Sequence, residues 1–141
     1  MKHVDPLISA ELQRFRERLA TPEEVSWHIR WILQAIREEL FSPSLNVQSL
    51  LRRCHTRDHN VSCQFKLETG MSIKHYIESL RLEAARELLV HDRFSAAVVA
   101  HAVGYSHLQT FYGAFRRRFE CTPGDCRVVR EPVCDAAELV P

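Results

Sequence analysis

Two stretches of this chain share one organisation: residues 46–67, NVQSLLRRCHTRDHNVSCQFKL, and residues 95–118, SAAVVAHAVGYSHLQTFYGAFRRR. Each opens with a short polar residue, Asn46 or Ser95, whose side-chain oxygen can accept hydrogen bonds from the unpaired N–H groups at a helix start. An apolar residue follows one turn later, and a phenylalanine stands near the end of each stretch. The pattern predicts two helix-turn-helix units, half a chain apart.

The second helix of each unit is the one that such a motif presents to a partner. We expect these recognition helices over residues 60–67 and 108–119, and in the latter three phenylalanines recur every four residues as a buried stripe. Gly70 and Gly104 suit a helix end and a turn, because glycine adopts positive φ without steric cost.

The segment between the two units is predicted to be one long helix. Ser72 can cap it, and its sequence IKHYIESLRLEAARELLV, residues 73–90, repeats apolar side chains at helical spacing. At about 1.5 Å per residue, about 18 residues span about 27 Å, and one turn of B-DNA is about 34 Å. Two units on such a spacer can place two helices in successive major-groove segments without dimerising. Sequence-specific DNA binding is therefore the leading hypothesis.

Two more helices are predicted before the first unit. Residues 5–20, DPLISAELQRFRERLA, form an amphipathic pattern that ends near Ala20. The run Thr21-Pro22-Glu23-Glu24 predicts the start of the next helix, with Thr as its cap and Pro in its first position. That helix presents apolar residues from Val25 to Leu40 on one face.

The expected fold is all-α, with two helix-turn-helix subdomains joined by a long central helix and an extra N-terminal helix. The predicted parts are an N-terminal helical extension (1–24), a first helix-turn-helix subdomain (25–70), a central linker helix (71–90), a second helix-turn-helix subdomain (91–130) and a flexible tail (131–141).

Composition is that of an ordinary soluble globular chain, with 45% hydrophobic and 26% charged residues among 141. The net charge is only +1, but residues 46–130 hold 13 Lys and Arg against 8 Asp and Glu. The basic excess thus coincides with the two motifs. Because DNA affinity depends on cations that displace counterions from phosphates, the small excess predicts modest affinity.

Other features predict a cytoplasmic protein without cofactor, metal or membrane span. No apolar run approaches the roughly 20 residues that cross a bilayer. Residues 1–15 lack the apolar segment of a secretory signal. Five cysteines, an odd number, argue against a disulfide framework. Cys54, His55, His59 and Cys63 have spacings that could form a zinc cluster, but a turn would scatter them. No nucleophile–base pair or phosphate loop indicates an enzyme.

Two segments, ETGMSIKHYIESLRLEAARELL (68–89) and VGYSHLQTFYGAFRRRFECTPGDCR (103–127), resemble the DNA-binding domain of the AraC/XylS family of bacterial transcription regulators. The resemblance covers about residues 26–130 and implies binding to double-stranded promoter DNA and recruitment of RNA polymerase. Family members often carry a separate effector-binding domain, for which this chain is too short. It therefore looks like the small stand-alone members of the MarA/SoxS/Rob type, or like an excised C-terminal domain.

Several positions depart from the family pattern. Arg is common near the middle of each recognition helix, where this chain has Cys63 and Gly113. Neither can replace the paired hydrogen bonds that Arg makes to guanine. Glu120 stands where Gly is usual, His55 replaces a turn Gly, and Cys126 replaces an aromatic residue. Either the sequence preference has changed or DNA binding has weakened. The alternative function is a degenerate AraC-like domain that acts as a protein-interaction module or anti-regulator.

The resemblance points polar side chains of both recognition helices toward DNA. The candidate DNA-binding residues are Arg57, His59, Asn60, Ser62, Cys63 and Lys66 in the first unit, and His107, Gln109, Thr110, Gly113, Arg116 and Arg117 in the second. Amide and hydroxyl groups suit base edges, whereas Lys and Arg also suit phosphates. An ordinary solvated helix face is the other explanation of the same residues.

Trp27 and Trp31 lie four residues apart in the second predicted helix. We expect at least Trp31 to pack in the core and one indole to stay partly exposed. Together with the extra N-terminal helix, an exposed indole suggests contact with RNA polymerase or self-association through that helix, since aromatic residues are enriched at interfaces. Simple packing of the helix onto the domain is the alternative.

Overall fold

The computed structural model describes residues 5–19, 22–54, 59–91 and 93–125, with the side chain of His59 left out. These residues form α1 (Pro6–Arg18), α2 (Trp27–Glu39), α3 (Val47–Arg53), α4 (His59–Thr69), α5 (Ile73–Leu89), α6 (Ala96–Ala102) and α7 (Leu108–Phe119). No strand occurs in the described part. The all-α prediction is confirmed.

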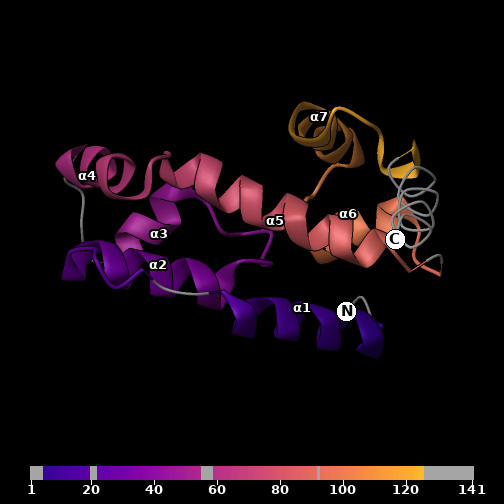
Figure 1. The fold of residues 1–141 in the computed structure, drawn as a ribbon, viewed down its shortest axis with the longest axis horizontal. Coiled ribbons are helices and arrows are strands. Elements are labelled where there is room, and N and C mark those ends of the chain that lie inside the picture. The colour runs from indigo at the N-terminus through magenta and orange to yellow at the C-terminus, as the bar shows by residue number, and fades with distance from the viewer. Residues whose placement is uncertain (1–4, 20–21, 55–58, 92, 126–141) are drawn as a thin grey trace, which may run out of the picture.

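The long helix α5 lies at the centre of the molecule (Figure 1). It packs against α1, α4, α6 and α7, whereas α2 packs against α3 and α4, and α6 against α7. We call α2–α4 the first unit and α6–α7 the second unit. In the view of Figure 1, α4 lies beyond the N-terminal end of α5 and α7 lies above α5, so both are at the upper edge of the molecule, while α1 and α2 lie along the lower edge. The 17 residues of α5 span about 26 Å at about 1.5 Å per residue.

The two units are anchored by the same kinds of side chain. Leu50 and Val99, one turn inside α3 and α6, are fully buried, as are Phe65 of α4 and Phe115 of α7. Phe65 meets the ring of Tyr76 edge-on, with 5.5 Å between centroids. Each buried side chain of this size contributes about 1.5–3 kcal/mol, so these anchors hold the recognition helices firmly.

The helices α3, α5 and α6 each start at the side-chain cap that the sequence predicts. The Asn46 side chain accepts from the Ser49 N–H at 2.8 Å, and the Ser49 hydroxyl accepts from the Asn46 N–H at 3.0 Å. Ser95 and Ser72 cap α6 and α5 through their hydroxyl oxygens. Each cap pairs N–H groups that have no partner within the helix.

The predicted start of α2 is wrong. The helix begins at Trp27, and Pro22 precedes a turn rather than opening the helix, while Thr21 lies outside the described residues. The cause is a distant contact, because Glu68 of α4 accepts from the Ser26 N–H at 2.6 Å and from its hydroxyl at 2.9 Å. These bonds accompany an extended Ser26, with ψ at 157°. Ser26 is therefore the N-cap, and the helix begins at the next residue, Trp27.

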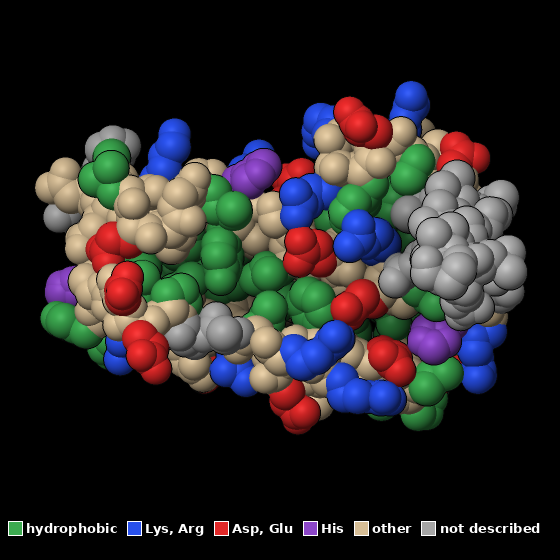
Figure 2. All heavy atoms as spheres, in the orientation of Figure 1, with side chains coloured by type: hydrophobic (Ala, Val, Ile, Leu, Met, Phe, Trp, Pro, Cys, Tyr) green, Lys and Arg blue, Asp and Glu red, His purple; other side chains and the backbone are tan. Residues whose placement is uncertain are grey.

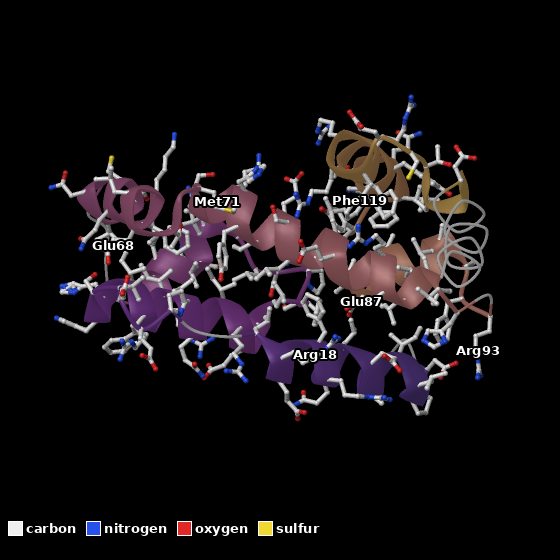
Figure 3. All side chains as sticks on the ribbon, viewed as in Figure 1. Arg18, Glu68, Met71, Glu87, Arg93 and Phe119 are labelled. Carbon is white, nitrogen blue, oxygen red and sulfur yellow. The ribbon has the colours of Figure 1, made fainter. Side chains whose placement is uncertain are left out.

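The extra N-terminal helix is confirmed as α1, which ends at Arg18. Its apolar face, Ile8, Leu12 and Phe15, is buried in the common core, and α1 packs along α5. Arg18 reaches across to Glu87 of α5 (Figure 3), with 2.8 Å between its Nη2 and the Oε2 of Glu87. Because α1 lies on the side of α5 away from α4 and α7, it leaves both recognition helices uncovered (Figure 1).

The expectation that Trp31 packs in the core is wrong. Trp27 is 66% exposed and Trp31 is 51% exposed. The helical period puts Ile29, Ile32 and Ile36 on the buried face of α2, and residues 27 and 31 then fall on the opposite face.

Candidate nucleic-acid interface

The first recognition helix, α4, is fastened to α2 by polar bonds at its buried edge. Gln64 donates to the Ser26 hydroxyl at 3.1 Å and to Glu68 at 2.8 Å. The Ser26 N–H, with Gln64 and the Ser26 hydroxyl, lowers the pKa of Glu68, so its carboxylate stays charged and keeps accepting these bonds. The helix is therefore held in one orientation while its other face stays open.

That open face contains part of the predicted set. Asn60, Cys63 and Lys66 are exposed, and Ser62 is half-buried. Arg57 and the side chain of His59 lie outside the described residues. Leu67 was not predicted, yet it is 85% exposed. Its position four residues after Cys63, on the same helical face, was the signal that could have found it.

The second recognition helix, α7, also presents a polar face. His107, Gln109, Thr110, Arg116 and Arg117 are exposed, and Gly113 is half-buried in their midst. Phe111, Ala114 and Phe115 face the core. The exposed polar residues and the buried apolar residues each recur with the helical period, so the predicted residues of this unit share one side of α7.

The three consecutive arginines of α7 have different surroundings. Arg118 donates to Glu83 of α5 at 2.7 Å and lies over the Phe119 ring, so it helps to fix α7 on α5. Arg117 is 72% exposed and lies 3.8 Å from the Glu78 carboxylate. Such an exposed pair is weak, and its guanidinium can turn to another anion at little cost. Arg116 is exposed to solvent.

Gly113 leaves an open position in the middle of the α7 face. A Cβ built there would meet only the Nη1 atom of Arg117, at 3.5 Å, which is ordinary contact distance. The helix backbone therefore has room for a larger side chain at this position, so the glycine is not required by packing.

Basic side chains also lie between the two recognition helices. Lys74 and His75, at the start of α5, are exposed and line a groove together with Arg117. Figure 2 shows Lys, Arg and His side chains along the edge formed by α4, the start of α5 and α7, with acidic side chains beside those of α7. Lys74 and His75 were missed because they belong to the linker helix rather than to a motif. The edge is mixed in charge, with cations projecting from each of its three helices.

Comparisons with known proteins agree with this architecture. A sequence profile described as a helix-turn-helix domain matches residues 50–128. The HTH-type transcriptional activator RhaS of Escherichia coli (strain SE11) is 31% identical over 100 residues, which are 71% of this chain and 36% of RhaS. The chain belongs to the AraC/XylS family. It spans about a third of the length of such relatives, 36% in the case of RhaS.

Solved structures of other bacterial regulators have the same fold. The DNA-binding domain of AdpA, a global transcriptional factor solved with a target DNA, has a TM-score of 0.67 at 22% identity, covering 74% of this chain and 93% of that one. An AraC-type regulator from Chromobacterium violaceum has a TM-score of 0.61 at 23% identity, covering 73% and 91%. The AraC/XylS family is one of transcription regulators, so the comparisons give no indication of an enzyme.

Other kinds of site have little support in the described residues. No cluster of three His, Cys, Asp or Glu side chains could hold a metal ion there, although His55 and the His59 side chain of the considered zinc cluster lie outside that part. Cys54 is half-buried, and burial raises the pKa of its thiol. No described helix has the length and apolar character needed to cross a bilayer.

Proposed function

We propose that this AraC-type chain is a sequence-specific, DNA-binding transcription regulator that inserts α4 and α7 into adjacent major-groove segments of one duplex. The observation that carries the proposal is the placement of both recognition helices at one edge of the molecule (Figure 1), each with a polar face open to solvent. RhaS is named as a transcriptional activator, and AdpA was solved with DNA, which supports the same use of this fold.

Phosphate contacts would supply most of the affinity. Lys66 of α4, Lys74 of α5, and Arg116 and Arg117 of α7 project from the edge that would meet DNA. Each cation that meets a phosphate releases counterions, and log K falls by about 0.9 per log unit of salt for each such contact. Four contacts predict a slope of about −3 to −4.

Base contacts would come from the exposed polar and apolar groups of the same faces. In α7, Gln109 and Thr110 can bond base edges, while Gly113 contributes no side chain. In α4, Asn60 suits adenine, and the exposed Leu67 suits a thymine methyl group, which accepts apolar contact. The chain would therefore prefer A·T pairs where family members with arginine prefer guanine.

The alternative, an interaction module without DNA binding, rests on the substitutions at Cys63 and Gly113 and on the mixed charge of the edge. Partner contacts fit the regulator as well. RNA polymerase is a proposed partner, for which the exposed Trp27 and Trp31 offer an aromatic surface. Self-association through α1 would need a surface other than the buried face that packs in the core.

The test measures binding to a random-sequence duplex at several salt concentrations between 50 and 200 mM, by fluorescence anisotropy. We expect the steep slope given above, and Lys66→Ala should reduce it by about one. Arg14→Ala is the matched control, because Arg14 is an exposed cation of α1, on the side of α5 away from the recognition helices. A slope near zero for the unaltered chain would contradict the proposed DNA binding and favour the interaction module.

A further inference from the structure

The two units face each other across a hollow. It has a volume of about 400 Å³ and is lined by Asn46 and Val47 of the first unit, Ser106 and Thr110 of the second, and α5. Side chains therefore do not fill the space between the units at this point. Their relative orientation depends on how each is fixed to α5.

Arg81 of α5 fixes the first unit at this hollow. Its Nε donates to the Leu40 carbonyl at 2.8 Å, and its Nη2 donates to the Ser42 carbonyl at 2.7 Å. Leu40 is the C-cap of α2, where carbonyl groups have no helical partner and the helix dipole is negative. The planar guanidinium makes both bonds at once, so it binds the end of α2 to the middle of α5 in one geometry.

The same guanidinium lies against the turn of the second unit. A Cβ on Gly104 would lie 3.0 Å from both Cζ and Nε of Arg81, closer than ordinary contact. Gly104 also has a φ of +107°, which disfavours any side chain. Glycine thus allows the backbone turn between α6 and α7 to rest directly on Arg81.

We propose that Arg81 is a positioning residue that locks both units onto α5 and so sets the offset between α4 and α7. It touches three parts of the chain: its own helix, the end of α2 with the following residues, and the α6–α7 turn. The consequence for DNA rests on the function proposed above, whereas the effect on geometry does not.

A fixed offset matters because the second helix binds as a tethered ligand. Once α4 occupies its groove, the effective concentration of α7 at the adjacent groove depends on how narrowly its position is distributed. A looser connection lowers affinity for a duplex with both sites and leaves affinity for a single site unchanged. We expect a loss of about tenfold for the two-site duplex, a modest part of the range that linkage can supply.

The geometric test needs no DNA. Spin labels are placed on the natural Cys63 and on Gln109→Cys, with the other cysteines replaced, and the distance distribution between α4 and α7 is measured by double electron–electron resonance. Arg81→Met should broaden or shift the distribution, and Arg14→Met, on α1, should leave it unchanged. If circular dichroism shows that Arg81→Met does not fold, Arg81→Lys takes its place, because a single ammonium cannot make both bonds in the guanidinium geometry. An unchanged distribution in the folded variant overturns the proposal.

The functional test uses a duplex selected from a random pool, and versions in which one base pair is added or removed between the two contacted segments. The unaltered chain should lose affinity sharply when the spacing changes, whereas the folded Arg81 variant should bind the original spacing about tenfold more weakly and depend less on spacing. Equal losses on single-site and two-site duplexes would show general destabilisation and overturn the proposal. If the unaltered chain binds no DNA, the proposed function fails, and the distance measurement still decides the role of Arg81.

Discussion

Glu120, directly after α7, holds a backbone conformation that suits glycine. Its φ of 60° and ψ of 21° are left-handed, and it is the one residue other than glycine with positive φ in the described part of the chain. An L side chain there costs about 1–2 kcal/mol. The conformation is retained because it ends the helix, with the Glu120 N–H donating to the Arg116 carbonyl at 2.8 Å.

Glu120→Gly should therefore stabilise the protein. Glycine removes the backbone strain of about 1–2 kcal/mol from the folded state. This gain is offset by about 0.4–1 kcal/mol, because glycine gives the unfolded chain more conformational freedom. Removal of an anion from the negative end of the helix adds a few tenths of a kcal/mol. The net gain is about 1 kcal/mol, which for a chain of this size corresponds to a rise in Tm of about 3–4 °C.

Two matched variants separate the backbone effect from the charge. Glu120→Gln removes the charge and keeps the strain, and Glu120→Asn introduces a residue that tolerates the left-handed region. Thermal unfolding followed by circular dichroism should give the order Gly, then Asn, then Gln, with Gln close to the unaltered chain. If Gly is no more stable than Gln, the reasoning from backbone strain is refuted.

Three further predictions concern the recognition helices. Arg117→Ala should weaken binding about equally for all duplex sequences and reduce the salt slope by about one; a loss confined to one base position would contradict a phosphate contact. Gly113→Arg should raise helix stability by about 1 kcal/mol, since the site has room for a side chain. In a selection from random DNA, the same variant should gain a preference for guanine of about 1–3 kcal/mol at one position. An unchanged base preference would argue against insertion of α7 into the groove. Alkylation at pH 8 should be fast at the exposed Cys63 and slow at Cys54, because the raised pKa of Cys54 leaves less thiolate. A duplex selected from a random pool should slow the alkylation of Cys63. A rate of alkylation that the duplex does not change would show that this face of α4 stays free.

Features that depend on neighbouring residues were predictable from the sequence. Asn46 and Ser95 cap their helices as expected, and Gly70 and Gly104 have positive φ. Each of these outcomes depends on a few bonds within one turn of the chain, so residue type and spacing are sufficient to predict them. The boundaries of α7 follow in the same way from its phenylalanine stripe.

Features that depend on distant residues were not predictable. The start of α2 is set by Glu68, 42 residues away from Ser26 in the sequence. The ion pair of Arg118 with Glu83 of α5, 35 residues earlier in the sequence, could not be predicted from residue type or spacing. The sequence did not distinguish Arg81 from Arg86 of the same helix, because the carbonyl groups that Arg81 binds belong to the distant first unit.

The candidate interface was predicted only in part. The exposure of Cys63, Lys66, Gln109 and Thr110 follows from helical periodicity, and the structure agrees. Their contact with DNA stays a prediction, as do the subdomain boundaries. Lys74 and His75 join the edge because α5 begins at Ile73, just after α4 ends at Thr69, and they were missed because the predicted contacts came only from the two helix-turn-helix motifs.

Hydroxyl-radical footprinting of the unaltered chain on a duplex selected from a random pool tests two-helix recognition most directly. Insertion of α4 and α7 into adjacent grooves predicts two protected segments on one face of the duplex, with centres about 10–10.5 base pairs apart. A single protected segment, or a duplex that stays uniformly cleaved at concentrations that saturate binding, would contradict it.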